Sequence, residues 1–196
     1  MPIEFNGTEH LDKSKDVSII ASKGNDNVTL FGSASIDGYK ENNYFPKPTG
    51  PTYNSITGSV GVINETGHSA SVTARHIPNF GNQVTAATNL NVLKTDNHKV
   101  DVNAFTTKNF TSAPIPNFST HGAGVNYQYK DVAQAAASVA HTPLAQRTDY
   151  AISTGLKLHE TPASSLSVNV GASKFDSPFT KGNWQPNGFL QFQKRF

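Results

Sequence analysis

The chain has 196 residues, with 16 Lys and Arg against 14 Asp and Glu, and it contains no cysteine. This length suits one β domain or two small modules, and the net charge of +2 is too small to indicate a nucleic-acid partner. The missing cysteines exclude a disulfide framework, thiolate metal sites and a cysteine nucleophile. No stretch approaches the roughly 18 apolar residues of a membrane helix, and residues 1–5 lack the pattern of a secretory leader.

Apolar and polar residues alternate with a period of two through most of the chain, which predicts half-buried antiparallel strands. Residues 1–50 are interpreted as a polar start, one strand at 28–36 and a Pro-rich loop. The turn signals lie at 64–67, 95–97, 130–131 and 160–163. Between them, strands are predicted at 84–92, 100–105, 123–129, 152–158 and 166–173. About ten strands are expected in all.

An internal repeat organises the rest of the chain. Ala74-Arg-His76-Ile-Pro78 matches Val139-Ala-His141-Thr-Pro143, and the two copies are about 65 residues apart. The alanine-rich stretch 133–140 therefore occupies a strand position, although its composition favours a helix. We predict an all-β antiparallel barrel or closed sandwich built from two similar four-stranded repeats. Its parts are an N-terminal segment 1–50, a first repeat 51–118 and a second repeat with the C-terminal strand 119–196, in one compact domain.

No motif for catalysis or for a cofactor is present, so the chain is predicted not to be an enzyme and to use neither cofactor nor metal. Gly122-Ala-Gly124 resembles part of a dinucleotide loop, but it lies in an alternating strand and is interpreted as close packing of small residues. His76 and His141 occupy equivalent repeat positions, and His68 shares the strand parity of His76. Two imidazoles could bind zinc if a third ligand came close, but local hydrogen bonding at strand ends is the preferred interpretation.

The C-terminal segment combines aromatic and cationic residues, a pattern that suits contact with anionic lipid. The alternative interpretation is a last strand whose aromatic side chains fill the core. On the first interpretation, the residues predicted to contact membrane or lipopolysaccharide are Lys94, Lys99, Lys174, Lys181, Trp184, Lys194 and Arg195.

Several segments in order resemble the attacins, antibacterial proteins of insect haemolymph. The resemblance is carried by residues 67–78, 86–105, 122–127 and 137–142, and by the closing stretches 174–179 and 184–186. It covers about residues 28–196, including two repeats that correspond to the so-called G-domains of that family. The resemblance implies a secreted, non-enzymatic immune effector that acts on Gram-negative bacteria through lipopolysaccharide and the outer membrane. It implies no nucleic-acid partner, no small-molecule substrate and no catalytic residues, and a leaderless intracellular form is the alternative localisation.

Two further interpretations remain open. A bacterial outer-membrane β-barrel, structural or porin-like, shows the same alternation and also ends in an aromatic residue. A carbohydrate-binding sandwich would rest on scattered Asn, Asp and aromatic residues. We expect a water-soluble body with a basic exterior, although alternation alone does not say whether the apolar face points inward or outward.

Overall fold

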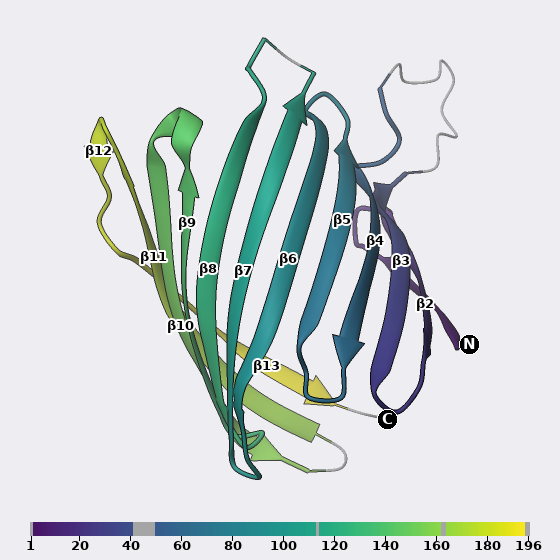
Figure 1. Ribbon diagram of the computed structural model, residues 1–196, viewed down its shortest axis with the longest axis vertical. Coiled ribbons are helices and arrows are strands. Elements are labelled where there is room, and N and C mark those ends of the chain that lie inside the picture. Colours follow the sequence, from purple (N-terminus) through teal and green to yellow (C-terminus); the bar gives the residue numbers. More distant parts are fainter. Residues whose placement is uncertain (1, 41–49, 113, 162–163, 195–196) are drawn as a thin grey trace. The chain divides into compact units, whose positions relative to one another are not determined.

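The computed structural model describes residues 2–40, 50–112, 114–161 and 164–194. Within them the chain forms strands and one short 3-10 helix, η1 (Pro143–Ala145) (Figure 1). The strands are β1 (Ile3–Glu9), β2 (Lys15–Gly24), β3 (Val28–Tyr39), β4 (Ser55–Asn64), β5 (Ser69–Ile77), β6 (Gly81–Lys94), β7 (His98–Thr111), β8 (Phe118–Tyr129), β9 (Ala133–Thr142), β10 (Arg147–Glu160), β11 (Ser164–Ser177), β12 (Thr180–Lys181) and β13 (Gln185–Lys194).

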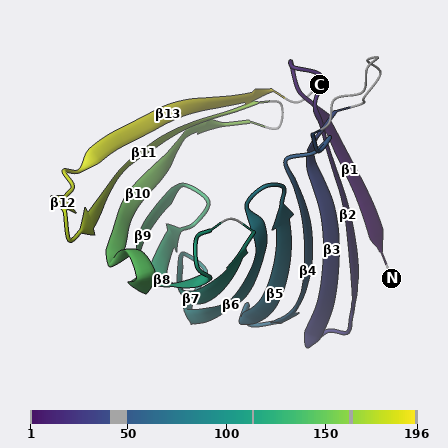
Figure 2. The ribbon, with the colours of Figure 1, turned by 90° about the horizontal axis from the view of Figure 1, so that it is seen from above.

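The strand order follows the chain from β1 to β12, and β13 pairs with β11. The predicted all-β antiparallel class is confirmed. The predicted strand number and closure are corrected, because the described residues form thirteen strands, twelve of them in a linear order with β13 beside β11, and no pairing of β1 closes this order into a ring. The chain turns back after β12, so that β12 and β13 share the outer edge of β11 (Figure 2).

Two compact units divide the chain, residues 1–88 with 107–118 and residues 89–106 with 119–196. In the first unit, the cross-strand register gives the sheet one apolar and one polar face. One apolar row runs through Ala21, Gly32, Val60 and Val72, which are direct partners on β2 to β5. The neighbouring positions face the other side and are mostly Ser and Thr. Because side chains alternate along each strand, one register fixes both faces.

The second unit has the same two-faced construction. Tyr129, Ala133, Leu156, Val168 and Leu190 are successive direct partners across β8, β9, β10, β11 and β13, and they form a row on the apolar face. Strand β9 confirms the preference for a strand over a helix at residues 133–140. Its alanines alternate between the two faces, and pairing with β8 and β10 overrides their helix propensity.

The polar face is the more enclosed of the two faces. No apolar side chain of the described residues is buried, whereas the polar residues Ser14, Ser55 and Asn109 are. The Ser55 hydroxyl donates to Asp37 Oδ2 at 2.6 Å, and Gln83 Nε2 donates to Asn109 Oδ1 at 2.7 Å. The sequence left open which way the apolar side chains point, and among the described residues they are the exposed ones. The polar side chains satisfy one another on the sheltered side, and the apolar side chains are left exposed.

Local sequence explains several details of the sheet. The predicted turn at 64–67 forms, with Gly67 at a φ of 89° and with Asn64 Oδ1 accepting the His68 N–H at 2.8 Å. Gly122 lies under the ring of Phe105, where an added Cβ would be 2.3 Å from the ring, which confirms the small-residue interpretation. Residues 1–50 contain β1 and β2 in addition to β3. These two strands were missed because every side chain of β1 is exposed and β2 does not alternate cleanly.

Candidate functional site

The apolar face of the second unit is the largest unexplained feature of this part of the molecule. Its side chains remain in solvent, Leu190 being 69% and Phe192 67% exposed. Monomeric soluble proteins rarely expose a contiguous apolar surface of this kind, and where they do, it marks a contact with protein or membrane. The exposed apolar side chains here are Val125, Val139, Ile152, Leu156, Val170, Leu190 and Phe192.

A shallow apolar hollow of about 420 Å³ lies on this face, over β8, β9 and β10. Val125, Val139 and Ile152 line it from the strands, and Trp184 lines it from the segment between β12 and β13. Its lining contains no charged side chain. The hollow can therefore accept an apolar group, and it offers nothing that would hold a charged one.

A cation and two aromatic rings stand together beside the hollow. Lys174 Nζ lies 4.8 Å from the centroid of the Tyr150 ring and 5.8 Å from that of Trp184, and 3.2 Å from Asp176 Oδ2. Tyr150 and Lys174 are direct cross-strand partners of β10 and β11, which explains their contact. Tyr and Trp rings next to an ammonium group suit a lipid–water boundary, because each has an apolar body and a polar tip.

The structure separates the residues predicted to contact a membrane. Lys174 and Trp184 lie together as described, whereas Lys94 is exposed at the end of β6 and Lys181 is exposed in β12. The side chain of Lys194 and all of Arg195 lie outside the described residues. Tyr150 was missed by sequence reasoning, because only the β10–β11 register places it beside Lys174.

Lys99 is held on the polar face and not on the apolar one. Its Nζ is 3.0 Å from Asp101 Oδ2, and Asn91 Nδ2 donates to Asp101 Oδ1 at 2.9 Å. Partial burial acts to raise the pKa of Asp101, but the hydrogen bonds from Asn91 and Lys99 outweigh it and leave the pKa below its ordinary value. The carboxylate therefore stays ionised and keeps Lys99 engaged.

The histidines act as local hydrogen-bonding groups. His76 Nδ1 lies 2.8 Å from Asn82 Oδ1, and His141 Nδ1 lies 2.9 Å from Thr148 Oγ1. Among the described residues, no three His, Cys, Asp or Glu side chains gather as a metal site would require. Nor do these residues include a helix with the length and apolar character to cross a bilayer.

Fold and surface together define a protein built on antiparallel sheet, with a polar face whose side chains hydrogen-bond one another and an apolar face left open. The model of the family described as "Attacin, C-terminal region" matches residues 78–196. The chain belongs to the attacin family.

Relatives agree with this assignment. The chain is 44% identical over 143 residues to "Defense protein 3" of Lonomia obliqua, covering 72% of this chain and 61% of that protein. It is 43% identical to "Attacin-B" of Hyalophora cecropia with the same coverage, and 40% identical to "Attacin" of Bombyx mori over 68% of this chain and 63% of that protein. The chain thus spans about three fifths of the length of these relatives.

A solved structure with a similar fold is the "Anion-selective porin from Comamonas acidovorans". The TM-score is 0.52 and the sequence identity 13%, over 93% of this chain and 57% of the porin. At this identity the likeness concerns the fold alone, and it carries no function to the chain.

Proposed function

We propose that this chain is a secreted, non-enzymatic antibacterial defence protein that acts on the outer membrane of Gram-negative bacteria. Membership of the attacin family supports the antibacterial role, and the printed names of relatives include both "Attacin" and "Defense protein". One observation carries the membrane step: in each unit taken by itself, the apolar side chains lie on the more exposed face of its strands. Membership of the attacin family supports a defence protein over the bacterial outer-membrane barrel that was the alternative.

Binding proceeds by attraction followed by burial. The exposed cations Lys94 and Lys181 draw the chain toward the phosphate groups of lipopolysaccharide, and Lys174, whose charge is paired with Asp176, stands with its aromatic partners where lipid and water meet. Each cation near an anionic surface contributes about 1 kcal/mol, and salt weakens this contribution. Lipid then covers the apolar face, and each Å² of apolar surface removed from water stabilises the bound state by about 25 cal/mol.

Trp184 is the single tryptophan of the chain and stands beside the apolar hollow, so its emission reports this step directly. Vesicles of phosphatidylethanolamine and phosphatidylglycerol, with and without lipopolysaccharide, are added at rising salt. We expect a blue shift, quenching by brominated acyl chains and weaker association at high salt. Bound protein whose Trp184 stays open to aqueous acrylamide would refute the proposal.

A killing assay tests the biological half of the proposal separately. The purified chain is added to Gram-negative cells of wild-type surface and to mutants with truncated lipopolysaccharide. We expect growth inhibition that depends on the outer-membrane composition. Inhibition that is equal on both strains would contradict lipopolysaccharide as the target, and no inhibition of either would contradict the antibacterial role.

A further inference from the structure

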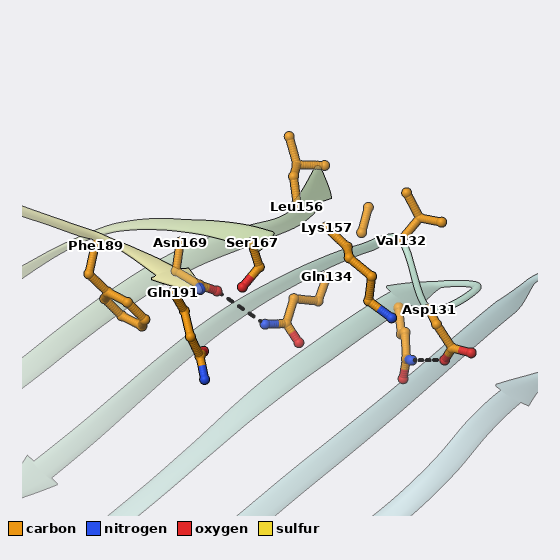
Figure 3. Close-up of a pocket in the computed structure, with 12 residues that line it drawn as sticks. Asp131, Val132, Gln134, Leu156, Lys157, Ser167, Asn169, Phe189 and Gln191 are labelled. Atoms are coloured by element: carbon orange, nitrogen blue, oxygen red, sulfur yellow. Dashed lines mark hydrogen bonds between the residues drawn. The ribbon is translucent and has the colours of Figure 1, made fainter. Parts of the chain in front are cut away.

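The polar face of the second unit contains a hollow that the membrane step does not use. Its volume is about 370 Å³, within the range of roughly 300–1,000 Å³ common for ligand pockets. Its floor is a straight row of direct cross-strand partners, which are Gln128, Gln134, Gly155, Asn169 and Phe189. In Figure 3, Gln134, Asn169 and Gln191 point into the same space, whereas Leu156 points away toward the apolar face.

Two carboxamides meet over the one residue in this row without a side chain. Gln134 Nε2 donates to Asn169 Oδ1 at 3.4 Å (Figure 3). Both residues are direct cross-strand partners of the buried Gly155. A Cβ at Gly155 would be 2.5 Å from Asn169 Oδ1 and 2.8 Å from Gln134 Nε2. The glycine therefore makes room for the pair. Each carboxamide has two N–H donors and two acceptor positions, and their mutual bond uses one donor of Gln134 and one acceptor position of Asn169, so both have further hydrogen-bonding capacity for a ligand.

Phe189 stands at one end of the row. Its ring is 62% exposed. Its cross-strand partner is Asn169, so the ring lies on the polar face, next to amide side chains. The exposed ring stands among carboxamides and the hydroxyl of Ser167 in the lining of the hollow. It is a suitable platform for a flat ligand with apolar C–H groups on its face and hydroxyls at its edge.

The charges around the hollow are already balanced. Lys157 Nζ lies 2.7 Å from Glu160 Oε2, and Asp131 Oδ1 accepts from Gln128 Nε2 at 3.2 Å. One cation and one carboxylate line the walls, and each has a partner. The hollow therefore favours an uncharged polar ligand over a phosphate or a lipid headgroup.

We propose that this hollow binds uncharged sugar rings, with the ring of Phe189 against the C–H face of one sugar and the amides of Gln134, Asn169 and Gln191 on its hydroxyls. This inference rests on the proposed function, because the polysaccharide of the Gram-negative surface would present such sugars. The polar face holds saccharide while the apolar face contacts lipid, so the two faces recognise the two chemical halves of one target.

Phe189 and Phe192 provide a matched pair on one strand. Both rings are exposed, Phe189 on the polar face and Phe192 on the apolar face opposite Leu166. Titrations use two probes, maltoheptaose and the polysaccharide released from lipopolysaccharide by acid and freed of lipid. We expect Phe189→Ala to weaken saccharide binding at least tenfold and to leave vesicle association unchanged. Phe192→Ala is expected to do the reverse.

The wild-type chain supplies a readout that needs no variant. In ¹H–¹⁵N spectra, the side-chain NH₂ signals of Gln134 and Asn169 are expected to shift on titration with either saccharide. The inference is overturned if neither probe moves these signals, or if Phe189→Ala binds both saccharides as the wild type does. Saccharide binding that fails while killing and vesicle association persist refutes this inference alone, and loss of killing and association refutes the proposed function.

Discussion

A charge placed on the apolar face separates the two faces of the sheet most clearly. Val72 and Ser71 are neighbours on β5, and their side chains lie on opposite faces. Val72 is 47% exposed beside Val60, whereas Ser71 is half-buried on the polar face opposite Gly61. Val72→Asp and Ser71→Asp change the net charge equally, so any difference between them comes from the face.

The size of the effect follows from the exposure of Val72. Transferring the remaining half of a valine side chain from water to lipid contributes about 1 kcal/mol, which the variant loses. A carboxylate held against hydrocarbon costs about 2 kcal/mol more. Together these correspond to about 100-fold weaker partitioning into lipopolysaccharide-containing vesicles. The free energy of unfolding in water changes by no more than about 1 kcal/mol in either variant, because replacing Val or Ser by Asp in a strand alters only the strand propensity of that position.

Co-sedimentation with vesicles measures the partition coefficient, and urea unfolding measures the stability of each variant. We expect Val72→Asp to lose membrane binding at near-normal stability and Ser71→Asp to stay within about threefold of the wild type. Equal losses in both variants would refute the assignment of the apolar face to lipid, and so would normal binding of Val72→Asp.

Three predictions concern the sheet itself. Gly122→Ala should destabilise the fold by about 1–3 kcal/mol in urea unfolding, because its Cβ would meet a ring at 2.3 Å, whereas Gly32→Ala, with its nearest atom at 3.7 Å, should change it much less. Asn109→Ala should cost about 1–3 kcal/mol by leaving a sheltered donor unpaired, and an unchanged melting temperature would contradict this. The hydrogen bond with Asp16 raises the pKa of His10 above 6.5, so protonated His10 stabilises the folded chain. This stabilisation is fully present below pH 6.5 and is lost as the pH rises through the raised pKa of His10. An NMR titration should show the midpoint falling back toward 6.5 in Asp16→Asn.

The sequence predicted many of the strands and left open which face of the sheet is exposed. Alternation at 84–92 and 123–129 was sufficient to locate β6 and β8, because a period of two is specific to strands. A sheet whose apolar side chains face inward and a sheet whose apolar side chains face outward show the same alternation in sequence. Only the burial of Ser55 and Asn109, together with the exposure of the valines, decides between them.

The candidate sites depended on register, which no local pattern reveals. Lys174 and Trp184 were predicted, but Tyr150 beside them comes from a strand more than 20 residues away in the chain. Gly155 carried no signal, and the roles of Gly155 and Phe189 both depend on their shared cross-strand partner Asn169. Phe189 alternates in phase with Gln185 and Gln191, and this was the one clue in the sequence that its ring lies on the polar face.

Site-directed spin labelling tests the central claim most directly, since the chain has no cysteine to remove. Single cysteines are introduced in turn at Ile152 and Leu156 on the apolar face and at Ser153 on the polar face of β10, and nitroxide accessibility is measured on lipopolysaccharide-containing vesicles. We predict that labels at Ile152 and Leu156 relax with oxygen dissolved in lipid and that the label at Ser153 relaxes with a water-soluble nickel complex. Equal accessibility to the nickel complex at all three positions would contradict the account.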